Sequence, residues 1–267
     1  MKYILSFSIP FIITFIFKNM FFNILNKPVC LRENYKKNLI PVCGGLIFIP
    51  LLLISTAILS LFKYQPESSL LFLLAVTVMS YAGLIDDLIG DRSVTGLKGH
   101  FKMILNGNLT TGGLKAILGL VIALIVSYIL SSNYINILIN TIIISLFTNL
   151  LNLTDLRPGR ASKTFIFFSI IFLIIGKGNP TFLLMVTAIL LVYFPSDLKG
   201  NIMMGDTGSN VLGITLGITS ILVLNFNLRV ALLVLLIAIH FITEKYSLTK
   251  IIEKTAVLNY LDMLGRK

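Results

Sequence analysis

The chain has 267 residues, of which 56% are hydrophobic and only 12% are charged, and its mean hydropathy is +0.94. Soluble domains carry about 25% charged residues, so this composition excludes an ordinary soluble protein. The net charge of +11 comes from lysines and arginines scattered between apolar runs, a pattern typical of membrane orientation and contact with anionic lipid. We therefore expect membrane lipid, and no nucleic acid, among the partners of the chain.

Repeated apolar runs predict an all-α, polytopic integral membrane protein with a single transmembrane domain over residues 1–267. The runs do not alternate apolar and polar residues, as the strands of a β-barrel would. The sixth and seventh runs are short for membrane spans. A helix of about 13 residues covers only about 20 Å of a roughly 30 Å hydrocarbon core. About nine spans are expected, near residues 3–22, 43–62, 69–85, 113–130, 134–151, 164–176, 180–194, 210–224 and 228–242.

The distribution of charge predicts that the N-terminus lies outside and the C-terminus inside. Basic residues gather in the segments that this orientation places in the cytosol, as the positive-inside rule requires. Of the eleven carboxylates, only Glu67 falls outside, although acidic residues contribute little to orientation. This second asymmetry predicts a carboxylate-containing site on the cytosolic face. The cytosolic segments are the loops at about 23–42, 86–112, 152–163 and 195–209 and the tail at 243–267.

The tail over residues 247–265 repeats apolar residues at helical spacing, and its charged residues lie mostly off that face. This pattern predicts one amphipathic helix at the membrane surface rather than a tenth span. The apolar positions are Leu248, Ile251, Ile252, Leu258, Leu261 and Leu264.

Three of the predicted cytosolic loops carry reactive groups: one begins at Asp86-Asp87, and the others cover residues 152–163 and 197–210. Each loop joins two spans, so helix packing could bring all three together. Carboxylates are hard oxygen ligands that suit Mg²⁺, with Mn²⁺ as an alternative, and lysine and arginine suit phosphate. The candidate carboxylates are Asp86, Asp87, Asp155 and Asp206, and the candidate cations are Lys98, Lys102, Arg157, Arg160 and Lys163.

Each of these residues alone also has a structural interpretation. Asp206, in Asp-Thr-Gly-Ser-Asn before an apolar run, could simply cap a helix. Asp86 and Asp87 could be solvated residues beyond a helix end. Arg160 and Lys163 could be ordinary positive-inside residues. The combination of carboxylates and cations in one set of loops favours a metal–phosphate substrate over these separate explanations.

Four segments carry a family resemblance: Pro41-Val42-Cys43-Gly44-Gly45, Asp86-Asp87, Asn152-Leu153-Thr154-Asp155 and Met204-Gly205-Asp206-Thr207-Gly208-Ser209. In that order they resemble the Pro-x-x-Gly-Gly, Asp-Asp, Asn-x-x-Asp and Met-Gly-Asp-x-Gly-Ser motifs of the polyprenyl-phosphate N-acetylhexosamine-1-phosphate transferases. Residues 96–102 resemble the Gly-Leu…Lys segment of the same family. This group, glycosyltransferase family 4, includes the enzymes that make the first lipid intermediate of peptidoglycan and start teichoic acid and O-antigen synthesis.

The resemblance implies transfer of a sugar 1-phosphate from a UDP-linked N-acetylhexosamine to undecaprenyl or another polyprenyl phosphate, with release of UMP. It implies a Mg²⁺-dependent enzyme of cell-envelope glycan synthesis in the bacterial plasma membrane, with a homodimer as a candidate assembly. Arg160 and Lys163 are candidates for binding the donor diphosphate on charge and position alone. By resemblance, catalysis falls to Asp86, Asp87 and Asp206, metal binding to Asp206 with Asp86 or Asn152, and substrate binding to Lys102, Asp155 and Gly205.

The second motif departs from the family pattern. The family continues Asn-x-x-Asp-Gly-x-Asp-Gly-Leu, whereas Leu156, Pro158 and Arg160 replace the first Gly, the second Asp and the Leu. Because the second Asp lies at the nucleotide-base pocket in family members, an altered donor is expected. The family's histidine-containing last loop and tenth span are also missing, which indicates a shortened and divergent member.

Two other functions stay open at this point. A catalytically silent scaffold of the same fold would explain the altered second motif and the missing histidine loop. A transporter would place ionisable groups or broken helices near the middle of the membrane, whereas only His240 lies deep in a predicted span. Mg²⁺-dependent release of UMP would separate an enzyme from both.

Overall fold

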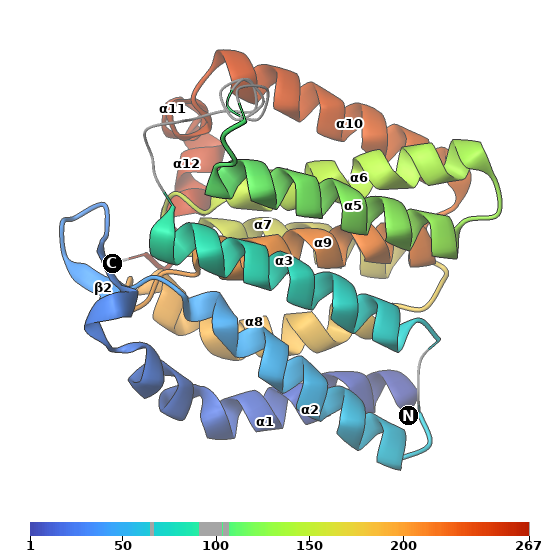
Figure 1. The fold of residues 1–267 in the computed structure, drawn as a ribbon, viewed down its shortest axis with the longest axis horizontal. Coiled ribbons are helices and arrows are strands. Elements are labelled where there is room, and N and C mark those ends of the chain that lie inside the picture. Colours follow the sequence, from blue (N-terminus) through green and yellow to red (C-terminus); the bar gives the residue numbers. More distant parts are fainter. Residues whose placement is uncertain (65–66, 91–102, 104–106, 267) are drawn as a thin grey trace.

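The computed structural model describes residues 1–64, 67–90, 103 and 107–266, and it is almost entirely helical (Figure 1). The long helices are α1 (Lys2–Leu25), α2 (Phe48–Leu61), α3 (Ser69–Ile89), α5 (Thr111–Leu130), α6 (Tyr134–Thr154), α7 (Arg160–Ile175), α8 (Thr181–Leu198), α9 (Gly205–Val223) and α10 (Phe226–Lys245). Between α1 and α2 the chain forms the 3₁₀ turns η1 (Pro28–Cys30) and η2 (Gly44–Ile47) on either side of an antiparallel hairpin of β1 (Leu31–Glu33) and β2 (Leu39–Pro41). The tail contains α11 (Leu248–Lys254) and α12 (Ala256–Met263).

Each of the nine predicted spans coincides with one of the long helices. Within the described part of the chain, seven helical segments are long and apolar enough to cross a membrane, and α7 and α9 are not among them. Helix α7 has 16 residues and is therefore about 24 Å long, and α9 begins with a polar turn. The predicted helical, multi-pass architecture is confirmed except for the short hairpin of β1 and β2, whereas the count of nine crossings stays a prediction.

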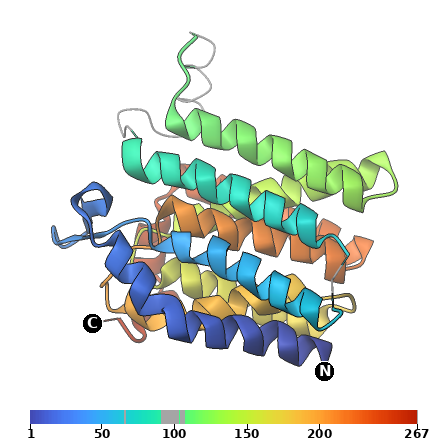
Figure 2. The same ribbon diagram turned by 60° about the horizontal axis from the view of Figure 1, so that its bottom comes forward.

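Helix α9 lies in the middle of the bundle and packs most extensively against α3 and α6 (Figures 1 and 2). Every residue from 207 to 220 is buried, so this part of α9 contacts other helices rather than lipid. Small residues permit the close approach of helix backbones. A Cβ atom added to Gly213 would overlap the Cα of Thr148 and lie 2.7 Å from the carbonyl oxygen of Phe147 in α6. This explains how a helix rich in glycine, serine and threonine occupies the core of a membrane protein.

Gly213→Ala is expected to lower the thermal unfolding midpoint of the purified protein, because its methyl group would meet backbone atoms that cannot rotate away. Overpacking of this kind typically costs about 1–3 kcal/mol. Gly119→Ala in α5 is the matched control, since its methyl group would meet only the end of the Met79 side chain, at 3.4 Å. Equal midpoints for the two variants in thermal melts would contradict the packing argument.

The tail differs from the single helix that the sequence pattern predicts. Thr255 has an extended backbone (φ −101°, ψ 109°) that separates α11 from α12. Ile252 and Asp262 are buried, so the tail also contacts the rest of the protein. Its location at a membrane surface stays a prediction. The C-terminus lies at the end of the bundle that carries the hairpin, and the N-terminus lies at the opposite end (Figures 1 and 2).

Candidate active site

The predicted reactive residues come from helix ends at the end of the bundle that carries the hairpin. Asp86 and Asp87 belong to the last turn of α3, which continues about one turn beyond the predicted span, to Ile89. Asn152 lies in the last turn of α6 and Asp206 in the first turn of α9. Packed helices therefore position side chains that the sequence pattern assigns to loops.

Asp86 and Asp206 face each other across the ammonium group of Lys115. The Nζ of Lys115 lies 2.7 Å from Asp86 Oδ2 and also forms an ion pair with Asp206 Oδ2. Thr111 donates a hydrogen bond to Asp86 Oδ1 at 2.5 Å. The amide of Asn152 satisfies both neighbours when its nitrogen donates to Asp206 Oδ1 (2.6 Å) and its oxygen accepts from Lys115 (3.1 Å). We call these five residues the carboxylate cluster.

Two residues of this cluster, Lys115 and Thr111, were missed by sequence reasoning, and Lys115 is the one that carries charge. It stands in the first turns of α5, inside an apolar run that is read as a membrane span. An ionisable residue inside such a run is a functional candidate by default, so this was the signal that could have identified it. The sequence does not show that its partners are Asp86 and Asp206, because they lie 29 and 91 residues away.

Asp87 has a different environment from Asp86. Its carboxylate accepts hydrogen bonds from the backbone amides of Asp206 (2.9 Å) and Thr207 (3.0 Å) and from the Thr207 hydroxyl (2.5 Å). A carboxylate at a helix N-terminus satisfies free amide groups and is favoured by the helix dipole. Gly205 has a positive φ of 69°, and a Cβ atom there would overlap Asp87 Oδ2. Asp87 therefore anchors the start of α9, and Gly205 permits that contact.

The Pro-x-x-Gly-Gly segment packs directly on the start of α9. The amides of Gly44 and Gly45 donate to the carbonyl oxygens of Met203 and Met204, both at 3.0 Å. A Cβ atom on Gly45 would overlap the Cα of Gly208. The glycines of two segments far apart in the sequence are thus required by a backbone-to-backbone contact.

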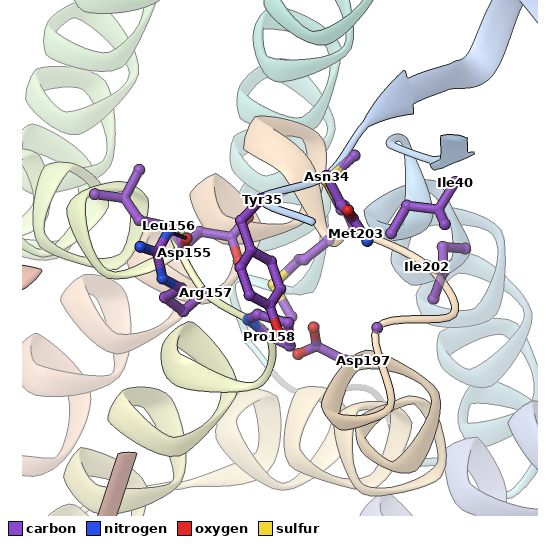
Figure 3. A pocket seen from close by; sticks show the side chains of 12 residues that line it. Asn34, Tyr35, Ile40, Asp155, Leu156, Arg157, Pro158, Asp197, Ile202 and Met203 are labelled. Carbon is purple, nitrogen blue, oxygen red and sulfur yellow. Dashed lines mark hydrogen bonds between the residues drawn. The ribbon is translucent and has the colours of Figure 1, made fainter. Parts of the chain in front are cut away.

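A small pocket lies between the hairpin, the α6–α7 loop and the segment before α9 (Figure 3), and its lining residues Asp155 and Met204 are within three residues of Asn152 and Asp206 of the carboxylate cluster. Its lining includes Tyr35, Asp155, Arg157, Pro158 and Asp197. The guanidinium carbon of Arg157 lies 5.2 Å from the centre of the Tyr35 ring. Two of the residues that replace the family's second motif, Leu156 and Pro158, also line this pocket. The altered motif and the pocket therefore occupy the same place.

The carboxyl groups of the pocket are not freely solvated. Asp197 is buried, and its Oδ2 accepts a hydrogen bond from Ser162 at 2.6 Å. Burial and then the nearby Asp197 carboxylate raise the pKa of Asp155 well above its ordinary value, and Asp206 and Asp87 act in the same direction. Asp155 and Asp197 are therefore two interacting carboxyl groups in the lining of the pocket.

The predicted donor-binding cations lie against the tail. Arg160 donates to the two carboxylate oxygens of Asp262, each at 2.9 Å. Lys163 donates to the carbonyl oxygens of Leu261 (2.9 Å) and Asp262 (2.6 Å). In the structure these two cations fasten the tail, and their binding of a donor diphosphate stays a prediction. Lys102, the predicted phosphate ligand, lies outside the described residues.

The donor atoms of the carboxylate cluster fit a hard divalent cation. Among the described residues, no group of three or more His, Cys, Asp or Glu side chains could hold a metal by itself. Mg²⁺ needs only one or two carboxylates, with water and substrate phosphates in its other positions. Asp86, Asp206 and the amide oxygen of Asn152 supply such a set. Lys115 supplies one positive charge at the same place, where it pairs with both carboxylates.

Comparison with known families gives one result. The sequence model described as glycosyl transferase family 4 matches residues 69–224, which is more than half of the chain and includes α3 through α9. All members of the carboxylate cluster lie in this region. The comparison with curated proteins finds no match. The chain therefore belongs to glycosyl transferase family 4, whose members transfer a sugar phosphate to a polyprenyl phosphate in a membrane.

Proposed function

We propose that the protein transfers the sugar 1-phosphate of a nucleotide-linked N-acetylhexosamine to undecaprenyl phosphate or another polyprenyl phosphate, on the cytosolic face of a bacterial plasma membrane. Family membership supports the general reaction. The observation that carries the proposal is the pair of carboxylates, Asp86 and Asp206, that face each other across Lys115. Phosphoryl transfer is catalysed mainly by positioning and charge stabilisation, and this arrangement of oxygen ligands and a cation can provide both.

The proposed reaction exchanges one phosphorus–oxygen bond for another. An oxygen of the lipid phosphate bonds to the phosphorus that carries the sugar. The bond from that phosphorus to the bridging oxygen of the donor breaks, and the nucleoside monophosphate leaves with the bridging oxygen. A direct transfer and a two-step route through an enzyme carboxylate give the same products.

The contacts favour different roles for the two neighbouring aspartates. Asp86 is held by Thr111 and Lys115 within the cluster, so it is our candidate to orient or deprotonate the lipid phosphate. Asp87 is engaged by three donors at the start of α9, so we assign it to positioning Asp206. Lys115 would offset the charge of the reacting phosphates.

Mg²⁺ is the proposed cofactor, with Mn²⁺ as the alternative. Asp86, Asp206 and Asn152 would hold it, and a bound divalent ion would supply a Lewis acid for the phosphate oxygens. The support is the chemistry of these donors and their shared contacts with Lys115.

The pocket beside the cluster is the proposed binding region for the donor nucleotide. Asp155 joins the two regions, since it lines the pocket and interacts electrostatically with Asp206. A UDP-linked sugar is the first donor to test. Pro158 supports testing other bases as well, because it lines the pocket at the position where the family pattern has an aspartate.

A donor panel tests the proposed function. Purified protein would be incubated with undecaprenyl phosphate, Mg²⁺ and N-acetylhexosamine or related sugars linked to UDP, GDP, CDP or dTDP. We expect at least one donor to yield equal amounts of lipid-linked sugar and nucleoside monophosphate, with both products lost in EDTA and restored by Mg²⁺. Activity with a GDP-, CDP- or dTDP-linked sugar but with none of the UDP-linked sugars would support an altered base pocket. Neither product with any donor would contradict the proposal and favour a silent scaffold.

A further inference from the structure

The tail is joined to the rest of the protein by buried charged groups. Asp262 accepts hydrogen bonds from Arg160 and also from Arg266, whose two nitrogens lie 2.8 and 3.1 Å from its oxygens. The exposed side-chain fractions are only 5% for Arg160, 6% for Asp262 and 7% for Arg266. Arg160 also donates to the hydroxyl of Thr249 in α11 at 3.0 Å. One carboxylate therefore holds two guanidinium groups away from bulk solvent.

These contacts reach the pocket through the first turn of α7. Arg160 begins this helix, and Lys163 in the same turn donates to tail carbonyl oxygens. Ser162, between them, donates to the pocket residue Asp197. Arg266 makes a second connection, since its Nε donates to the carbonyl oxygen of Pro158 at 3.2 Å. The turn thus contacts the tail through two side chains and the pocket through a third.

We propose that Asp262 is a positioning residue for donor binding, which fixes the α6–α7 loop and the first turn of α7 through Arg160 and Arg266. The inference rests on the proposed function, because it takes the pocket beside Asp155 as the donor site. Asp262 does not line the pocket itself. Asp262 instead acts on the positions of Pro158 and Asp197, which line the pocket.

Removal of the Asp262 charge would leave two largely buried arginines close together without the carboxylate that pairs with both of them. Breaking a buried ion pair by removing one partner is strongly unfavourable, so the arginines are expected to move toward water and release the turn. Burial favours the neutral form of Asp262, but the hydrogen bonds from Arg160 and Arg266 outweigh this and lower its pKa to about 2. The stabilisation from this group is therefore present above its unfolded pKa of about 3.9 and is lost only in acid.

Asp262→Asn tests this role. With the donor that the wild-type protein uses, the donor KM is expected to rise by about tenfold, because small displacements of binding groups have large kinetic effects, while kcat changes less than about twofold. Asp262→Glu, which restores the charge, is expected to recover part of the loss. Hydrogen exchange should increase at the amides of residues 156–163 in Asp262→Asn. Glu253→Gln is the matched control, since Glu253 is an exposed carboxylate of the same tail.

The opposite result has a clear meaning. If the tail instead shields Arg160 and Lys163 from the donor, Asp262→Asn would lower the donor KM. A lower donor KM or an unchanged donor KM would overturn the inference.

If Asp262→Asn does not fold, Arg266→Lys takes its place, because it keeps the charge but cannot bridge Asp262 and the Pro158 carbonyl. Its donor KM should also rise, and an unchanged value would overturn the inference. A wild-type protein inactive with every donor refutes the proposed function and this inference with it, whereas an active protein with an unaffected KM refutes the inference alone.

Discussion

Asp206→Asn is expected to lower kcat for sugar-phosphate transfer by about 100-fold or more, the usual scale for removing one group that stabilises charge in a transition state. Asparagine has nearly the same size as aspartate but carries no charge, so the variant loses the ion pair with Lys115 and one of the proposed anionic metal ligands. The start of α9 should remain in place, because Asp87 bonds to the backbone amide of residue 206. Steady-state rates of lipid-linked sugar formation measure the loss.

Glu253→Gln serves as the matched control, since it makes the same chemical change at an exposed position of the tail. A second measurement does not depend on activity. Mg²⁺ is expected to raise the thermal midpoint of the wild-type protein and to raise that of Asp206→Asn by less, because a ligand that binds only the folded state stabilises it. Transfer at the wild-type rate by Asp206→Asn in Mg²⁺ would show that the assignment of Asp206 is wrong.

Lys115→Met is expected to reduce both activity and stability. The methionine side chain fills similar space, but Asp86 and Asp206 would face each other without the cation that now separates them. The three side chains are about one-fifth exposed, so removing the cation should cost somewhat less than the about 3–5 kcal/mol typical of a fully buried pair. The kcat should fall by about 100-fold or more, because the group proposed to offset phosphate charge is lost. Thermal melts and transfer rates of the same preparation measure the two effects.

A double variant separates the two effects of Lys115→Met. Adding Asp86→Asn removes the repulsion between carboxylates, so the double variant should recover much of the thermal stability without recovering activity. Such non-additivity identifies residues that interact directly. Lys250→Met is the control, because Lys250 is exposed on α11. If Lys115→Met melted and reacted like the control, Lys115 would have no role in the cluster.

The apolar runs were sufficient to predict the membrane class and the positions of the long helices, and the motifs were sufficient to predict the family. These features are encoded locally, since each run must bury its own backbone in a membrane-spanning helix. The helix ends were less accurate. Asp86, Asn152 and Asp206 are parts of helices rather than loops, because hydropathy reports where apolar residues stop and not where backbone hydrogen bonding stops.

The two adjacent aspartates show what a motif leaves undetermined. The sequence pattern treats Asp86 and Asp87 as one pair, yet neighbouring residues on a helix point in directions about 100° apart. In the folded chain, Asp86 contacts Lys115 while Asp87 contacts the backbone of α9. The packing of α3 against α9 decides which aspartate faces the reactive groups.

The cations of the predicted 152–163 loop also show that a sequence pattern does not determine which groups a side chain contacts. Arg160 and Lys163 have the charge expected for diphosphate binding, but in the structure they contact Asp262 and the nearby backbone. Asp262 follows Arg160 by 102 residues, so no local pattern could pair them.

The sequence by itself determined that this chain is a helical membrane protein, and its motifs were sufficient to predict the family. Only the tertiary structure decided that Lys115 joins Asp86 to Asp206, that Asp87 anchors α9, and that the tail fastens the first turn of α7. The physical reason is that hydropathy and helix formation depend on neighbours in the sequence. The partner of a buried charge depends on which helix ends meet, and that is set by the packing of the whole bundle around α9.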